Sequence, residues 1–276
     1  MTSLQGFFQV VHSETVRASL AWIFVLAHVL GDFLFQGDGV VRGRREGRAQ
    51  AYATHALVHL ALLAVLSWPA LSAALVGAWL AVAAAHVAID ALKDAWRRRA
   101  APAGGPPGVW AFLLDQAAHV WVIFFVVRLP SAQALQPWRG GEAVLGLLAG
   151  VSPPEYLGHP AWWRMVAVYA AVILGGAVLV RTALEACRVE PGAAGFAGSE
   201  RELPRIGAYV GMLERALILT FLLSEAPAAV GFVIAAKSIA RFKELENKAF
   251  AEYYLVGTLV SVVVALGGYL IVRSPL

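Results

Sequence analysis

Four pairs of ionisable side chains lie inside apolar runs in the first half of this 276-residue chain. The pairs are His28 with Asp32, His55 with His59, His86 with Asp90, and Asp115 with His119. The members of each pair are four positions apart, so on a helix both lie on one face, one turn apart. Ionisable groups are costly inside a bilayer and commonly mark a functional site. We therefore expect these eight residues to form one shared polar site.

The residue types in these pairs favour a divalent metal site. Neutral imidazole and carboxylate are ligands of Zn²⁺, Mn²⁺ and Fe²⁺. One tetrahedral ion takes only three or four protein ligands, so eight candidates indicate a dinuclear site, or one ion with an outer set of orienting groups. Cys187 is the only cysteine, which excludes an internal disulfide and a thiolate-rich metal site.

Further polar side chains extend the faces of these pairs. Asp94 follows Asp90 by one helical turn, Gln116 is next to Asp115, and Gln36 continues the face of the first pair. Asp94 and Gln116 are candidates for substrate contact and catalysis, or for orienting the metal ligands. The alternative to metal binding is a metal-free network that joins helices or relays protons.

Composition indicates the elements that position these residues. The chain is 59% hydrophobic and 14% charged, with a mean hydropathy of +0.68, whereas a soluble domain carries about 25% charged residues. This predicts an all-α, multi-pass transmembrane bundle. The apolar runs give about eight spans: 18–36, 50–68, 70–92, 108–128, 161–183, 206–223, 227–242 and 250–272. The sixth and seventh spans are alternatively a re-entrant hairpin.

Lys and Arg concentrate in the loops after the first, third, fifth and seventh spans. The positive-inside rule makes these loops cytoplasmic and places both termini on the opposite side of the membrane. The net charge of +4 then needs no nucleic-acid partner. At about 1.5 Å per residue, the paired residues lie about 3 to 16 Å from the cytoplasmic ends of their spans. All four pairs are therefore expected in the cytoplasmic half of the membrane.

The chain divides into three parts. Residues 1–128 form a four-span half with the His/Asp site, residues 129–160 an external connecting segment, and residues 161–276 a four-span C-terminal half. The C-terminal half has its own charged residues, which predict interhelical ion pairs and snorkelling or, alternatively, a basic clamp for a lipid headgroup or phosphate. They are Glu214, Arg215, Lys237, Arg241 and Glu252.

The order of the polar motifs resembles a known family. Within about residues 18–128 they are His28-x3-Asp32-x3-Gln36, His55-x3-His59, His86-x3-Asp90-x2-Lys93 and Asp115-Gln116-x2-His119. This combination resembles the bacterial membrane family catalogued as domain of unknown function 3307, a name that implies no established activity. His-x3-Asp pairs in membrane helices are also similar, more loosely, to the sites of membrane-bound metal-dependent hydrolases.

The leading hypothesis is therefore a metal-dependent intramembrane hydrolase with Zn, Mn or Fe as cofactor. Its substrate would be lipid-like or phosphate-bearing, with membrane lipid as the expected partner, and an oligomer is compatible with the sequence. The alternatives are a carrier for divalent cations or protons and a non-catalytic scaffold for a soluble partner. A buried site without a path to the opposite face favours the enzyme, a continuous polar path favours the carrier, and a filled, dry core favours the scaffold.

Overall fold

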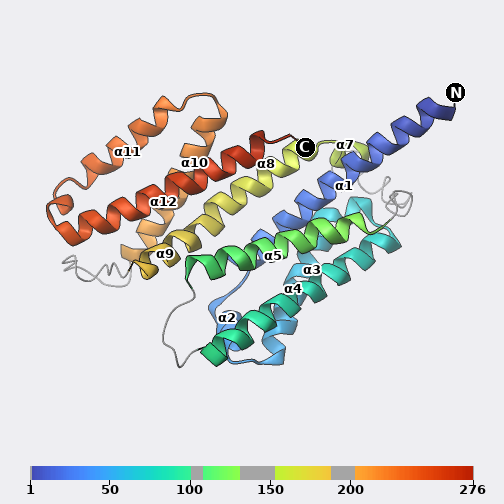
Figure 1. Cartoon of the computed structure of the whole chain (residues 1–276), viewed down its shortest axis with the longest axis horizontal. Helices are drawn as coiled ribbons and strands as arrows, with labels where there is room; N and C mark the ends of the chain where they lie inside the picture. The colour runs from blue at the N-terminus through green and yellow to red at the C-terminus, as the bar shows by residue number, and fades with distance from the viewer. Residues whose placement is uncertain (1, 101–107, 131–152, 188–202, 276) are drawn as a thin grey trace. The chain divides into compact units, whose positions relative to one another are not determined.

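The computed structural model describes residues 2–100, 108–130, 153–187 and 203–275, and in these ranges it is helical without strands (Figure 1). Six helices are long and apolar enough to cross a membrane: Glu14–Phe33, Ala49–Ala70, Ala73–Arg99, Val109–Arg128, Pro160–Ala186 and Lys248–Arg273. The predicted helical, multi-pass membrane class is confirmed. The sixth and seventh predicted spans correspond to α10 (Leu203–Leu223) and α11 (Ala228–Ala240). Neither is among the six, and α11 is an apolar helix too short to qualify.

The chain forms two compact units. Unit 1 takes its described residues from 1–103 and 114–167, and unit 2 takes its own from 104–113 and 168–275. Most of the predicted connecting segment, 129–160, lies outside the described residues.

Unit 1 is built on α1 and the helices that follow it in the chain. Its elements are α1 (Thr2–Phe33), α2 (Asp38–Arg45), α3 (Ala49–Ser67), η1 (Trp68–Ala70), α4 (Ala73–Ala100), most of α5 (Val109–Arg128), α7 (Pro153–Leu157) and the start of α8 (Pro160–Ala170). The helix α3 packs against both α1 and α4, and α2 folds back onto α3 and α4. Gly47 makes the turn from α2 to α3 at φ 78°, a conformation that glycine adopts without strain.

The part of unit 1 remote from α2 has an apolar interior. Its largest buried side chains are Leu20, Phe24, Leu63, Leu75 and Ile123. Two hydrogen bonds attach α7 there: Ser19 Oγ donates to the carbonyl of Leu157 over 2.6 Å, and Tyr156 Oη donates to that of Leu66 over 2.7 Å. Burial raises the pKa of Tyr156 to about 12, so its phenol remains a neutral donor.

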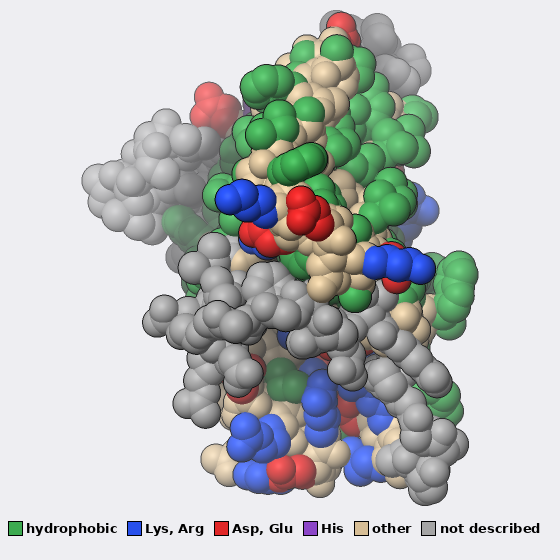
Figure 2. Space-filling model, turned by 90° about the vertical axis from the view of Figure 1, so that its left-hand side faces the viewer, with side chains coloured by type: hydrophobic (Ala, Val, Ile, Leu, Met, Phe, Trp, Pro, Cys, Tyr) green, Lys and Arg blue, Asp and Glu red, His purple; other side chains and the backbone are tan. Residues whose placement is uncertain are grey.

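The opposite end of unit 1, formed by α2 and the C-terminal end of α4, is basic. Figure 2 shows Lys and Arg side chains gathered at this lower end. The exposed cations include Arg42, Arg45, Arg48, Arg98 and Arg99. They belong to loops and helix ends that the sequence predicts to be cytoplasmic, and this orientation stays a prediction.

Unit 2 contains the end of α8, η4 (Ala171–Gly175), α9 (Gly176–Ala186), α10, α11, η6 (Glu244–Glu246) and α12 (Lys248–Arg273). The helices α9, α10 and α12 pack against one another, and α11 packs against α10. One π-helical turn, η4, lies between α8 and α9. Asn247 caps α12, because its side chain accepts a hydrogen bond from the Phe250 amide over 3.1 Å.

Candidate metal centre

The structure brings the eight paired residues together at the α2 end of unit 1. Each of α1, α3, α4 and α5 carries one pair, and the spacing of four residues turns both members of each pair toward the interior. The α1 pair lies at the C-terminal end of its helix and the pairs of α3, α4 and α5 lie nearer the middle of theirs, yet side chains of α1, α3 and α4 are in direct contact. The pairs therefore lie at a common level, as their predicted depth requires.

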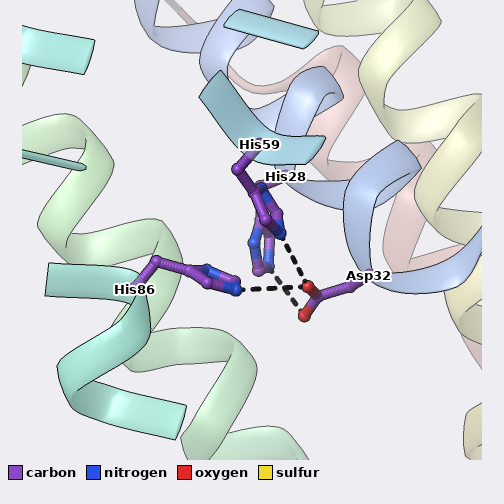
Figure 3. Close-up of side chains that lie close together, drawn as sticks. All are labelled: His28, Asp32, His59 and His86. Atoms are coloured by element: carbon purple, nitrogen blue, oxygen red, sulfur yellow. Dashed lines mark hydrogen bonds and ion pairs between the residues drawn. The ribbon is translucent and has the colours of Figure 1, made fainter. Parts of the chain in front are cut away.

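Four of these side chains form a compact group that we call the imidazole cluster: Asp32, His55, His59 and His86. Asp32 Oδ1 lies 3.1 Å from Nε2 of both His55 and His59 and 3.3 Å from Nε2 of His86. His55 Nε2 is 2.9 Å from His86 Nε2 and 3.3 Å from His59 Nε2. Figure 3 shows His28, His59 and His86 all directed at the Asp32 carboxylate, and single ligand atoms of these four residues lie within 4.8 Å of one another.

These separations suit ligands of one ion. Nitrogen and oxygen ligands about 2.1 Å from a tetrahedral ion lie about 3.4 Å from one another, and about 3.0 Å in an octahedral shell. Hydrogen bonds alone cannot account for all five close contacts within the cluster, because three neutral imidazoles supply at most three N–H groups to them. A shared cation accounts for all five contacts at once.

The charge of the imidazole cluster also favours a cation. The side chain of Asp32 is only 9% exposed, and its ion-pair partners among the described residues are all histidines. An ionised carboxylate removed from water is costly unless a positive charge compensates it. A divalent ion held by this carboxylate and three neutral imidazoles would supply that charge, so the donor set fits a metal.

A second group, the charged layer, adjoins the cluster and consists of Arg44, Asp90, Lys93 and Asp115. The Arg44 guanidinium contacts Asp90 Oδ2 directly. Lys93 Nζ donates to Asp90 Oδ1 over 2.6 Å and to Asp115 Oδ2 over 2.9 Å. Asp90 Oδ2 also lies 3.3 Å from His86 Nε2. The charged layer is thus internally neutralised, in contrast to Asp32.

The comparison with known families concerns this part of the chain. Residues 20–139 match the family described as protein of unknown function (DUF3307). This stretch is a domain of unknown function 3307. The resemblance inferred from the ordered motifs is thereby confirmed. No match was found among curated proteins or among solved structures. The DUF3307 domain contains all eight paired residues, together with both cations of the charged layer.

His119 of the DUF3307 domain presents a free ligand atom. Its Nδ1 donates to the carbonyl oxygen of Asp115 over 2.8 Å, which leaves Nε2 as an acceptor. This Nε2 is buried without a hydrogen-bond partner, and so is Asp115 Oδ1. Metal-binding histidines commonly donate their second ring nitrogen to a backbone carbonyl in this way.

His28 lies at the edge of the imidazole cluster. Its Nε2 is 4.0 Å from Asp32 Oδ2 and 3.2 Å from Gln116 Oε1. Gln116 Nε2 in turn donates to Asp115 Oδ2 over 3.2 Å. Gln116, predicted to contact substrate, therefore connects the cluster to the charged layer.

The other two predicted polar residues occupy different surroundings. Gln36 Nε2 lies 3.2 Å from His55 Nδ1, so its amide contacts the cluster. Asp94 is buried one turn beyond Asp90 and accepts a hydrogen bond from Tyr52 over 3.1 Å. Asp94 thus belongs to the basic end of unit 1.

Sequence reasoning gave no role in the site to three contributors, although Lys93 is part of one of the family motifs. Lys93 is three residues after Asp90, a helical spacing that would have identified it as a partner. Arg44 reaches Asp90 because α2 folds back, which no local pattern predicts. Gly31 is needed for packing, since a Cβ there would lie 2.5 Å from His59 Cε1.

A small cavity adjoins the imidazole cluster and has room for about one water molecule. Its polar lining is His28, His59, His86 and His119, and its apolar lining includes Phe24, Leu63, Val82 and Ile123. Beyond the cavity, the buried interior of the described part of unit 1 is apolar apart from Arg164 and two serines, Ser19 and Ser67, whose hydroxyls donate to backbone carbonyls. Among these residues, no continuous polar path leads to the far end.

Proposed function

We propose that unit 1 is a metal-dependent hydrolase of the bacterial inner membrane, with its site toward the cytoplasm and both termini in the periplasm. Zn, Mn or Fe would be held by Asp32, His55, His59 and His86. The observation that carries the proposal is the convergence of four ligand atoms on one point, with a buried carboxylate that has no Lys or Arg partner among the described residues.

The residues around this point suit hydrolysis. A bound ion would supply a water of lowered pKa and would polarise the scissile bond. The adjoining cavity gives space for that water. Arg44 and Lys93 bond to the neighbouring Asp90, where their N–H donors would stabilise negative charge developing on a substrate. A phosphate-bearing or ester-containing membrane lipid would meet both the cations and the apolar lining.

The two alternative functions have less support. A carrier needs polar groups along its path, whereas the described interior beyond the cavity is mostly apolar, with Arg164, Ser19 and Ser67 as its buried polar residues. A scaffold needs a filled core with satisfied polar groups, whereas His119 Nε2 and Asp115 Oδ1 are buried without hydrogen-bond partners.

Activity is tested on the full chain in vesicles of phosphatidylethanolamine and phosphatidylglycerol, after chelation and reloading with Zn²⁺, Mn²⁺ or Fe²⁺. Release of fatty acid, phosphate and headgroup is measured for wild type, Asp32→Asn and the control His159→Ala, whose histidine is exposed. We expect metal-dependent release that is lost only in Asp32→Asn. Metal flux across the same vesicles without any lipid cleavage would contradict the hydrolase and support the carrier.

A further inference from the structure

We infer that Lys93 occupies the place of a second metal ion, so that the centre holds one ion although its ligands would hold two. This inference rests on the proposed function, because it presupposes the first ion. It concerns the ligand set formed by Asp90, Asp115 and His119.

The carboxylate of Asp90 faces two cation positions. Its Oδ2 accepts from the Arg44 guanidinium and lies 3.3 Å from His86 Nε2 and 3.5 Å from His55 Nε2, next to the proposed ion. Its Oδ1 points the other way and accepts from Lys93 Nζ over 2.6 Å. In two-metal hydrolases the ions lie about 3.5–4 Å apart. A carboxylate placed between two positive charges in this manner suits such a pair, with the ammonium as the second charge.

The position beside Lys93 has the ligands of a metal site. Single ligand atoms of Asp90, Asp115 and His119 lie within 4.8 Å of one another, close enough to share an ion. Lys93 Nζ contacts two of these three residues. Asp115 Oδ1 is buried without a hydrogen-bond partner, and His119 Nδ1 lies 3.7 Å from it. The ligand set therefore offers more acceptor atoms than the ammonium uses.

The charges explain why a lysine can exclude an ion. Asp90 and Asp115 carry two negative charges, and Arg44 and Lys93 carry two positive charges, which leaves the charged layer neutral. A divalent ion added to this layer would meet an ammonium at the same oxygens and be repelled. Without the Lys93 charge, the layer has one uncompensated carboxylate, three ligand residues and the space that the ammonium filled.

The test is the number of ions bound per chain. Wild type and variants, purified in detergent, are saturated with Zn²⁺, desalted and measured by elemental mass spectrometry. We expect about one ion in wild type and in Lys93→Arg, which keeps the charge, and about two in Lys93→Met and Lys93→Gln. Lys248→Met removes an exposed lysine as the matched control and should leave about one ion. Adding Asp115→Asn to Lys93→Met should return the content to about one.

The outcomes separate this inference from the proposed function. A content of about one ion in wild type and in both neutral Lys93 variants would overturn the inference and leave the proposed function intact. About two ions in wild type would also overturn it. Absence of bound metal from wild type would overturn both. Circular dichroism establishes that each neutral variant folds like wild type before its metal content is compared. If Lys93→Met does not fold, the comparison uses Lys93→Gln, which retains a hydrogen-bond donor.

Discussion

Units 1 and 2 both bury charged side chains among apolar helices, but they differ in how completely the buried polar atoms find ion-pair or hydrogen-bond partners. In unit 2, Lys237 Nζ donates to Glu214 over 2.7 Å and is 3.3 Å from the Thr258 hydroxyl. The predicted interhelical ion pairing is confirmed for these two charges. In unit 1, by contrast, Asp32 has no Lys or Arg partner among the described residues, and His119 Nε2 has no hydrogen-bond partner.

Arg215 illustrates how unit 2 satisfies a buried charge. It is 2% exposed, and its guanidinium donates to the carbonyls of Val172 and Ile173 over 2.8 and 2.9 Å. Both carbonyls belong to the π-helical turn η4, where the regular hydrogen-bond pattern of the α-helix is interrupted. Gly176 makes room, since a Cβ there would lie 2.8 Å from Arg215 Nε. Here a buried charge stabilises the packing of α10 against η4.

The comparison teaches that the number of charged residues in a membrane helix does not distinguish a site from a structural network. The distinction lies in whether acceptor atoms remain free after every donor has been assigned. Unit 1 retains two such atoms, His119 Nε2 and Asp115 Oδ1, and the predictions below are specific to metal binding.

The largest expected effect is loss of metal from His55→Ala combined with His59→Ala. Removing two of four ligands leaves too few donors, so metal content should fall below about a tenth of an ion per chain. Insertion should persist, because alanine is less costly than histidine in a bilayer. Elemental analysis with circular dichroism checks both statements, and His159→Ala is the control. Retention of the ion would show that it binds elsewhere.

Arg215→Met should lower the stability of the protein, in contrast to the variants that lower its metal content. It leaves the Val172 and Ile173 carbonyls without their donor, and we expect a loss of about 3 kcal/mol in unfolding free energy. Metal content should stay unchanged. Thermal unfolding in detergent measures the effect against Arg181→Met, which removes an exposed arginine. A metal loss equal to that of the double histidine variant would contradict a purely structural role for Arg215.

Gly31→Ala should weaken metal binding without removing a ligand. The added methyl collides with the His59 ring and displaces it, for which we expect about a 10- to 100-fold loss of affinity, as for other changes that misorient a ligand. Competition with a chromogenic chelator measures the affinity. Gly77→Ala is the matched control, since its Cβ would meet open space. Equal affinities in the two variants would argue against His59 as a ligand.

Asp94→Asn should have the smallest effect on metal. Asp94 bonds to Tyr52 and is outside the imidazole cluster, so metal content should remain within about twofold of wild type. Lipid cleavage should nevertheless fall, because Asp94 is a candidate for substrate contact and catalysis. A metal loss as complete as in the double histidine variant would place Asp94 among the ligands.

Much of unit 1 was predictable because the signals that specify its helices and residue pairs lie within single segments of the sequence. Spacings of four residues located the pairs on helix faces, and apolar run lengths located the helices. The contributions of Arg44 and Gly31 depend on how separate helices approach each other, which no single segment specifies. The Arg215 contacts were likewise hidden, because a π-helical turn leaves no clear mark on an apolar sequence. The alternatives for α10 and α11 stayed open because length and composition alone decide poorly for a short apolar helix.

The most direct test of the central claim is the metal content of wild-type protein. The protein is purified without chelators, and its metal content is measured before and after incubation with Zn²⁺, Mn²⁺ and Fe²⁺ in turn. We predict about one tightly held ion per chain for at least one of these metals, and its loss in Asp32→Asn. Absence of stoichiometric metal under all of these conditions would contradict the metal centre and leave the eight residues as a structural or proton-relay network.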